Sequence, residues 1–351
     1  MLRPTTKADV KVFYHINDLC RLKRPVFLAA GFFDGIHLGH QQVLRRAVSA
    51  ARANGGEAWA MTFDPHPLKI LTPDAAPLLL TDTAHKLQLL RQSGIDGCLL
   101  IPFSRRFAAT PAPGFLKELE LGIPTLTSIF MGDDWRFGHQ GQGDTVLLKA
   151  WATPRNITVQ RVSSIRRGGR AISSTRIRHA VNTGKLNEAT ALLGRPFSIL
   201  GTVVPGMRMG RKLGFPTANL KAHNEACPPI GIYAVQAIVS GHTYPGVVSF
   251  GHHPSLKRVT NPLLELHLLD KRMNLYRRNI EVYFLRRLRS EKKFLNLEDL
   301  IRQIEKDIQT TRKVLASQAM KKLWIRTLQR WHPDIIVSQQ IIRKRRDKER
   351  E

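Results

Sequence analysis

Cysteines are few in this chain, and a long apolar run is missing. The three cysteines, Cys20, Cys98 and Cys227, lie far apart without paired spacing, which argues against a disulfide framework and against a zinc site. No apolar stretch approaches the roughly 18 residues of a membrane span, and the N-terminus lacks the pattern of a signal peptide. We therefore expect a soluble, unexported protein of a reducing compartment, the cytoplasm.

Acidic residues are also scarce. The chain has 27 aspartates and glutamates against 55 lysines and arginines, which leaves a net charge of +28. This charge attracts phosphates, nucleic acid and anionic membranes, and it does not identify which of them is the partner. An enzyme with polyphosphate substrates would use part of it, and the rest is expected on solvated surface. A specific nucleic-acid function is the less favoured interpretation.

The length of 351 residues predicts two domains. In the first half, short β-rich runs alternate with helical stretches, at residues 26–31, 56–63, 97–103, 127–132 and 156–162. Buried parallel strands have this nearly continuous apolar character, and their alternation with helices predicts a doubly wound α/β sheet of the Rossmann type. Ligands of such sheets bind at the carboxyl ends of the strands, so the chemistry is expected at the first βα junction.

Near residue 195 the pattern changes. From Arg195 to about Phe284, β segments follow one another at hairpin-like intervals, with glycine and proline between them, which predicts a small antiparallel barrel. A helix should follow with Asn296 as its cap and an apolar face packed on the barrel, since apolar residues recur at helical spacing at Leu297, Leu300, Ile301, Ile304 and Ile308.

The run GFFDGIHLGHQ, residues 31–41, is the strongest local signal, because it joins the first expected strand to a helix. A helix N-terminus offers free N–H groups and a positive dipole end, and glycines let the backbone approach a phosphate closely. His37 and His40 would then face the same anion and stabilise charge that develops at an attacked phosphorus. The alternative is a turn that simply contains two histidines.

The run ISSTRIRHAV, residues 172–181, predicts a second helix start, with Ser173 or Ser174 as N-cap. Thr175, Arg176 and Arg178 would place a hydroxyl and guanidinium groups in its first turns, as a pyrophosphate clamp does. Taken alone, the segment fits a capped surface helix slightly better. A phosphate-binding HxGH motif in the same domain reverses that preference.

With these motifs in order, the sequence resembles the prokaryotic bifunctional riboflavin kinase/FAD synthetase family, whose first module is an HxGH nucleotidyltransferase. FFDGIHLGH, TFDPHP at 62–67, MGDDWRFG at 131–138, ISSTRIR at 172–178 and the kinase signature at 193–220 recur in the family's order. The resemblance implies ATP-dependent phosphorylation of riboflavin to FMN and adenylylation of FMN to FAD. It also implies Mg²⁺ as cofactor, and it covers about residues 10–315.

The resemblance further implies roles for residues of the first module. His37 and His40 would serve adenylyl transfer. The ATP pocket would be shaped by Gly31, Phe33, Asp34 and Gly39, and the leaving pyrophosphate would be held by Ser174, Thr175 and Arg178. The flavin side would include Asp64, Asp133 and Arg136, although Asp64 could equally cap a turn.

The second module has its own set of candidate site residues. Gly206, Gly210 and Gly214 would allow a flexible flap over nucleotide phosphates. Thr217 and Asn219 supply neutral oxygens, which suit a Mg²⁺ ion bridging to ATP. By resemblance, Glu265 is the base that takes the proton from the ribityl hydroxyl as it attacks the γ-phosphate. Without the resemblance, a strand glutamate is usually only solvent-facing.

Two loops of the kinase module depart from the family. In SFGHHPSL, Ser249, His253 and Ser255 replace Asn, Arg and Thr, and in KRMNLYRR, Asn274 and Arg277 replace an Asp and a Gly. We therefore expect these substitutions to affect how the kinase module positions its flavin. The alternative is an FAD synthetase alone, with an impaired kinase domain.

The sequence thus predicts an adenylyltransferase domain at 1–185, a kinase domain at 186–315 and a basic C-terminal extension at 316–351. In the extension, Leu323, Trp324, Leu328 and Trp331 would form one face of a short helix that ends near Pro333. A docking helix is favoured over a nucleic-acid-binding one. The expected partners are riboflavin, FMN and ATP, and the oligomeric state stays open.

Overall fold

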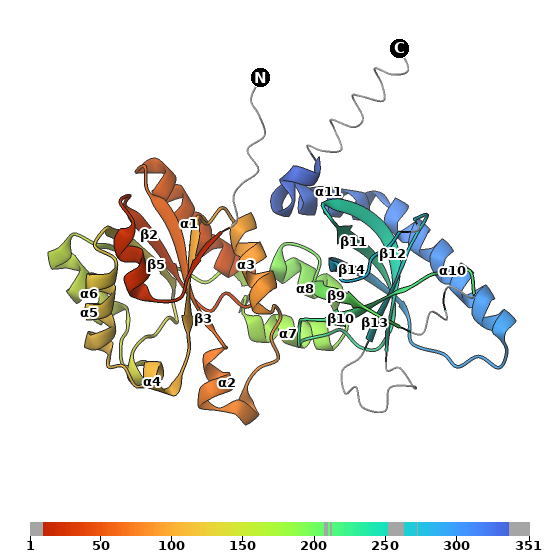
Figure 1. The fold of residues 1–351 in the computed structure, drawn as a ribbon, viewed down its shortest axis with the longest axis horizontal. Helices are drawn as coiled ribbons and strands as arrows, with labels where there is room; N and C mark the ends of the chain where they lie inside the picture. The colour runs from red at the N-terminus through yellow and green to blue at the C-terminus, as the bar shows by residue number, and fades with distance from the viewer. Residues whose placement is uncertain (1–9, 207–209, 211–212, 252–262, 272, 337–351) are drawn as a thin grey trace, which may run out of the picture. The chain divides into compact units, whose positions relative to one another are not determined.

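The computed structural model describes residues 10–206, 210, 213–251, 263–271 and 273–336 (Figure 1). The chain divides into two compact units. The N-terminal unit lies within residues 1–77 and 83–175, and the C-terminal unit lies within 78–82 and 176–351. Each unit has its own sheet and is described by itself.

The N-terminal unit is built on a parallel sheet of six strands in the order β1-β4-β3-β2-β5-β6. The strands are β1 Lys11–Phe13, β2 Val26–Ala30, β3 Glu57–Asp64, β4 Gly97–Pro102, β5 Leu126–Gly132 and β6 Thr158–Val162. The five predicted strands and the doubly wound sheet are confirmed. After β2 the chain adds β3 and β4 on one side and then β5 and β6 on the other, so the switch point lies between β2 and β5.

Helices cover both faces of this sheet, with α1 and α3 on one side and α5 and α6 on the other (Figure 1). The α-helices of the unit are α1 Leu38–Ala53, α2 Pro67–Leu71, α3 Thr83–Gln92, α4 Arg105–Ala108, α5 Ala112–Gly122 and α6 Thr145–Ala152. Short 3₁₀ segments lie at Ile16–Arg21, Pro73–Ala75, His139–Gly141 and Thr153–Arg155. Val43, Leu44, Ala47 and Ala51 of α1 recur at helical spacing and are buried, which holds this helix on the sheet.

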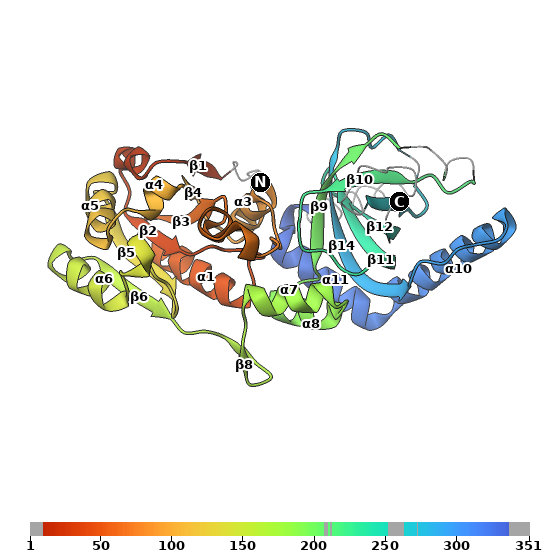
Figure 2. The same ribbon diagram turned by 90° about the horizontal axis from the view of Figure 1, so that it is seen from below.

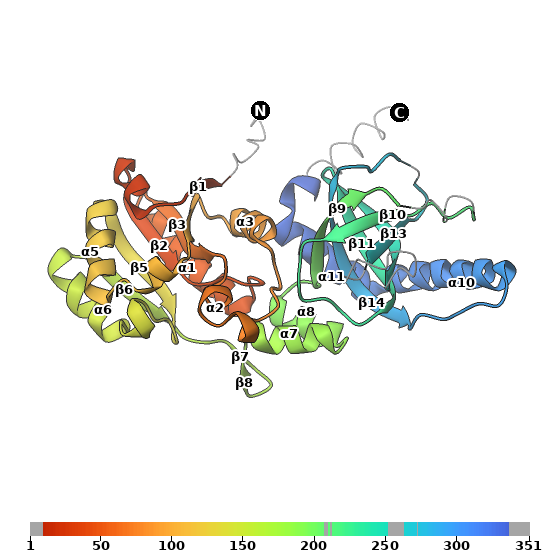
Figure 3. The ribbon, with the colours of Figure 1, turned by 60° about the horizontal axis from the view of Figure 1, so that its bottom comes forward.

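A short antiparallel hairpin, β7 Arg166–Arg167 and β8 Arg170–Ala171, follows β6 and leads directly into α7 Ser174–Asn182 (Figures 2 and 3). Helix α7 begins in the N-terminal unit, and its residues from Arg176 onward belong to the C-terminal unit. Helix α8, Leu186–Leu193, ends at Gly194 in the left-handed conformation, which is typical of a helix C-terminus.

The C-terminal unit is a closed antiparallel barrel with the order β10-β13-β12-β11-β14-β9. The strands are β9 Ser198–Val204, β10 Ala218–Ala222, β11 Gly231–Val239, β12 His242–Gly251, β13 Leu263–Leu268 and β14 Asn279–Arg289. Along β13 the buried residues alternate with partly exposed ones, as expected for one face toward the barrel interior. The predicted barrel is therefore confirmed.

Two helices follow the barrel, α10 Leu297–Ala316 and α11 Gln318–Trp331. Asn296 caps α10, because its side-chain oxygen accepts a hydrogen bond from the Asp299 backbone N–H at 2.8 Å. Helix α10 lies against β11, β12 and β14, although its first residue, Leu297, stays exposed. The predicted helix that ends before Pro333 is confirmed as α11. Among the described residues, no helix is long and apolar enough to cross a membrane.

Candidate active sites

The first candidate site lies at the start of α1, directly after β2 and at the switch point of the sheet. His37 is the N-cap of α1, and its Nδ1 accepts a hydrogen bond from the His40 backbone N–H at 3.3 Å. Because a ring nitrogen that accepts carries no proton, a neutral His37 has its proton on Nε2. The two imidazole rings stack with their centroids 3.6 Å apart. The fold thus gathers two imidazoles where a helix end already favours an anion.

His40 is held as a neutral imidazole. Burial lowers its pKa well below the ordinary value of 6.5, and the charges of His37 and Lys86 lower that pKa further. At neutral pH the ring can therefore donate a hydrogen bond without carrying a charge. Lys86 is a buried residue of α3 whose ammonium donates to the Phe63 carbonyl, 3.4 Å away at the end of β3. Sequence reasoning missed Lys86, since no local pattern distinguishes it from other helix lysines.

The loop before α1 is compact and has little room for side chains. A Cβ on Gly31 would lie 3.1 Å from the Phe33 ring, and a Cβ on Gly39 would lie 3.1 Å from the His37 ring. The Phe33 backbone has a left-handed φ of 52°, and its buried ring meets His40 edge-on at 5.4 Å. A side chain at Gly31 or Gly39 would crowd the Phe33 or the His37 ring, so glycine at both positions favours the close packing of these rings.

Helix α7 is tied to this loop at its first residue. The Ser174 hydroxyl donates to the carbonyl of Asp34, a buried residue, at 3.0 Å. Thr175 follows in the same turn, and Arg178 lies one turn further along α7, beyond the boundary of the N-terminal unit. The structure therefore joins the serine of the predicted pyrophosphate clamp to the HxGH loop.

The three residues predicted near the flavin lie at or beyond the ends of β3 and β5. Asp64 ends β3, where its carbonyl accepts from the Phe103 backbone N–H at 3.0 Å. The Asp133 carboxylate accepts from the backbone N–H and the hydroxyl of Ser164, at 2.8 and 3.1 Å. The exposed Arg136 pairs with Asp144 at 3.4 Å. Asp133 is thus placed at the switch-point edge, whereas Arg136 pairs with a residue at the start of α6.

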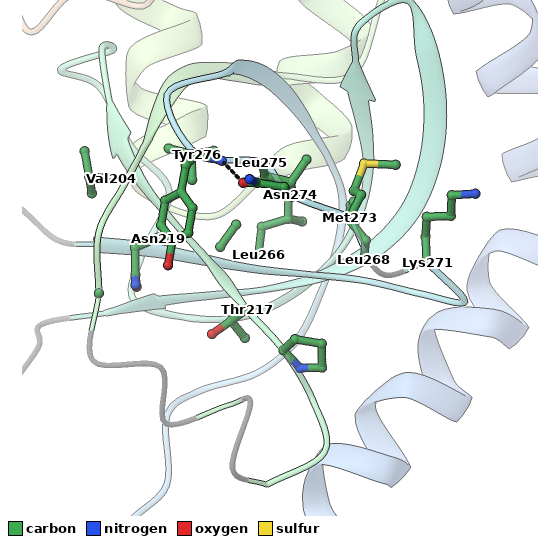
Figure 4. A pocket seen from close by; sticks show the side chains of 14 residues that line it. Val204, Thr217, Asn219, Leu266, Leu268, Lys271, Met273, Asn274, Leu275 and Tyr276 are labelled. Atoms are coloured by element: carbon green, nitrogen blue, oxygen red, sulfur yellow. Dashed lines mark hydrogen bonds between the residues drawn. The ribbon is translucent and has the colours of Figure 1, made fainter.

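The second candidate site is a cavity of about 520 Å³ in the barrel unit (Figure 4). Gly206, Thr217 and Asn219 line it, together with a wall formed by Lys271 and residues 273–276. The predicted metal-binding oxygens and the loop that departs from the family therefore border one cavity. Met273 and Tyr276 line the cavity and were missed as site residues. The His267 Nδ1 donates to the Pro216 carbonyl at 2.9 Å, which holds the turn before Thr217.

The register of the barrel sets Glu265 beside Asn219, one of the residues that line the cavity. In β13 it pairs directly with Asn219 of β10 and with Ser249 of β12. Directly paired residues share a face of the sheet, so Glu265 and Asn219 lie on the same side of the barrel wall. The side chains of Leu264 and Leu266, its neighbours in β13, are buried on the opposite face.

The predicted flap glycines have a steric reason. A Cβ on Gly206 would overlap the end of the Asn219 side chain, which can turn away, whereas a Cβ on Gly210 would overlap the backbone carbonyl oxygen of Phe215. The close backbone contact therefore excludes a side chain at Gly210. Residues 207–209 and 211–212, which complete the predicted flap, lie outside the described residues.

In loop 271–278, which differs from the family at two positions, the replacement at Asn274 keeps the hydrogen bond of the turn. The Asn274 side-chain oxygen accepts from the Tyr276 backbone N–H at 3.1 Å, as an aspartate oxygen would (Figure 4). Arg277 has a left-handed φ of 62°, which a glycine adopts without strain. The structural departure is therefore concentrated at Arg277. His253 and Ser255 of the other loop lie outside the described residues.

Comparisons with known proteins bear on both units. The FAD synthetase family matches residues 20–176, and the riboflavin kinase family matches residues 193–315. A bifunctional riboflavin kinase/FMN adenylyltransferase of Escherichia coli K12 is 37% identical over 286 residues, covering 81% of this chain and 91% of the relative. This chain belongs to the bifunctional riboflavin kinase/FMN adenylyltransferase family.

Other relatives agree with that membership. The Bacillus subtilis (strain 168) protein of the same description is 35% identical over 292 residues, with 80% of this chain and 90% of the relative covered. A crystal structure described as a macrolide-efflux protein from Streptococcus pneumoniae has a TM-score of 0.74 and 29% identity. It covers 87% of this chain and 99% of the streptococcal chain. This likeness supports the two-unit fold, and the efflux description applies to the streptococcal protein.

Proposed function

We propose that this chain makes FMN from riboflavin and FAD from FMN, using ATP in both reactions and releasing pyrophosphate in the second. The observation that carries the proposal is that each unit of this family member keeps its own site. The N-terminal unit has paired imidazoles at a helix start. The barrel unit has Thr217 and Asn219 at one cavity, and Glu265 pairs with Asn219 in the next strand. We assign adenylyl transfer to residues 1–185 and the kinase to residues 186–315.

In adenylyl transfer, a phosphate oxygen of FMN attacks the α-phosphorus of ATP, and the bond to the pyrophosphate oxygen breaks. The Nε2–H of His37 and the N–H of the neutral His40 would donate to the charged oxygens of the α-phosphate. The ATP pocket would be shaped by Gly31, Phe33, Asp34 and Gly39. The leaving pyrophosphate would lie against Ser174, Thr175 and Arg178. The flavin would be positioned by Asp64, Asp133 and Arg136.

In the kinase, Glu265 takes the proton of the ribityl hydroxyl as that oxygen attacks the γ-phosphorus, and ADP leaves. Thr217 and Asn219 fit a Mg²⁺ ion, because both offer neutral oxygens at the same cavity. Among the described residues no cluster of histidine, cysteine or acidic side chains suits a metal, so such an ion would complete its shell with phosphate oxygens and water. When bound, it would neutralise phosphate charge.

The first test is product formation by the purified chain. Incubation with riboflavin and Mg-ATP should yield FMN and then FAD, separated by chromatography and detected by flavin fluorescence. Conversion of supplied FMN without turnover of riboflavin would support the alternative of an FAD synthetase with an impaired kinase. The cytoplasmic location stays a prediction.

Restoring the family pattern in the departing loop should improve the kinase alone. Arg277→Gly with Asn274→Asp is expected to lower the riboflavin KM or speed FMN release. The change removes a cation, and glycine adopts the left-handed conformation without the strain of roughly 1 kcal/mol that a non-glycine residue has there. Steady-state kinetics of both reactions measure it, and FAD synthesis from FMN should not change. Arg277→Ala, which removes only the charge, separates the two causes. Unchanged kinase parameters would show the substitutions to be neutral, and worse parameters would contradict the prediction.

A further inference from the structure

The segment 317–336, here called the C-terminal strap, consists of α11 and the residues that follow it. It lies beyond residue 315, where the match to the riboflavin kinase family ends. Its inward side chains are nevertheless as buried as a protein core, with Leu328, Trp331 and Ile335 at 5%, 2% and 5% exposure. The strap is therefore an integral part of the C-terminal unit and more than an appended tail.

The strap covers a buried cluster of polar groups on the barrel. Glu281 of β14 accepts a hydrogen bond from the Ser198 hydroxyl at 2.9 Å, and both residues are buried. From the strap, the His332 Nε2 lies 2.7 Å from the Tyr283 hydroxyl and 3.6 Å from the second carboxylate oxygen of Glu281. One histidine of the strap thus contacts two polar side chains of β14, Glu281 and Tyr283.

Aromatic rings of the strap also pack over Tyr283 and Arg195 beside this polar cluster. Trp324 meets the Tyr283 ring edge-on at 5.2 Å, and the Arg195 guanidinium carbon lies 4.6 Å over the Trp331 ring. Burial raises the pKa of Tyr283, which keeps its hydroxyl protonated. A carboxylate and a guanidinium buried together need partners on every side, because an uncompensated buried charge is strongly destabilising.

The covered strands continue to the kinase cavity. Tyr283 pairs with Ser198 in the β14–β9 ladder, and the same ladder runs on to Asn279 opposite Thr202. Directly beyond it, Val203 exchanges backbone hydrogen bonds with Arg277 and Arg278, at 3.1 and 3.0 Å. Val203 and residues 273–276 line the cavity. A shift of β14 against β9 at the strap would therefore displace the cavity wall.

We propose that the C-terminal strap positions the flavin wall of the kinase site, with His332 and Glu281 as positioning residues. The proposal rests on the kinase function proposed above. The strap closes the cluster around Glu281 and holds β14 against β9, and that ladder holds loop 273–278 at the width that binds riboflavin. Neither residue touches the reacting atoms, so the strap acts on binding more than on phosphoryl transfer.

The test uses the full chain with His332→Phe, which keeps a planar aromatic ring and removes both ring nitrogens. We expect the riboflavin KM to rise several-fold with a smaller change in kcat, and adenylylation of supplied FMN to stay as in wild type. His332→Gln, which returns a polar atom near the position of Nε2, should recover most of the riboflavin affinity. Gln329→Ala, on the exposed face of α11, is the matched control and should change nothing.

Riboflavin binding, measured by quenching of flavin fluorescence, gives the same comparison independently of turnover. A wild-type chain that binds riboflavin without phosphorylating it would contradict the kinase function and leave the strap testable by its Kd. If His332→Phe fails to fold, the double variant Glu281→Gln with His332→Phe is tested in its stead, because it also removes the buried charge of Glu281. An unchanged riboflavin KM and Kd in a folded variant would overturn the proposal.

Discussion

FAD formation from FMN should fall by about 10²-fold or more in His40→Ala, because the substitution removes a preorganised N–H donor from the site where the α-phosphorus is attacked. ATP binding should suffer less, since the helix N-terminus remains. The Nδ1 of His37 still accepts from that backbone N–H, so the tautomer of His37 is preserved. The measurement is the kcat and KM of adenylylation with FMN and ATP varied separately.

A donor-retaining variant sharpens this result. His40→Gln can still present an N–H near the position of Nε2, so it should keep more activity than His40→Ala. Formation of FMN from riboflavin serves as the internal control in both variants, because it takes place in the other unit. Near-normal FAD synthesis in a folded His40→Ala protein would remove His40 from the mechanism.

The second large effect is expected at Glu265. Glu265→Gln preserves shape and hydrogen-bonding capacity but cannot take up a proton at neutral pH, so FMN formation from riboflavin should be lost, by about 10²-fold or more. Adenylylation of supplied FMN should remain almost unchanged. Glu298→Gln makes the same chemical change on the exposed first turn of α10 and should affect neither reaction.

The same experiment also tests whether the two reactions take place in separate units. Product analysis with riboflavin and with FMN as separate substrates reports on each unit, and thermal unfolding shows whether the variant is folded. If both activities fell together in a folded Glu265→Gln protein, the assignment of the two reactions to separate units would be wrong.

Much of the fold could be predicted because its signals are local. The strands at 26–31 and 97–103 are continuous apolar runs, and their burial on both faces is what an all-parallel sheet requires. The cap at Asn296 and the end of α11 before Pro333 are likewise decided by neighbouring residues. Strand β1, of three residues, was missed because so short a run has no readable period.

The amino-acid sequence by itself determined which segments become strands and helices, and where the HxGH motif and the pair Thr217 and Asn219 lie along them. Hydrophobic period and turn chemistry suffice for this, because they act over a few residues. Only the tertiary structure decided which distant groups meet. The register that sets Glu265 beside Asn219 and the contact of His332 with Glu281 join segments far apart in the chain. The low pKa of His40 has the same origin, since burial and the charge of Lys86 on another helix lower it. Such contacts depend on all elements packing at once, and no local pattern records them.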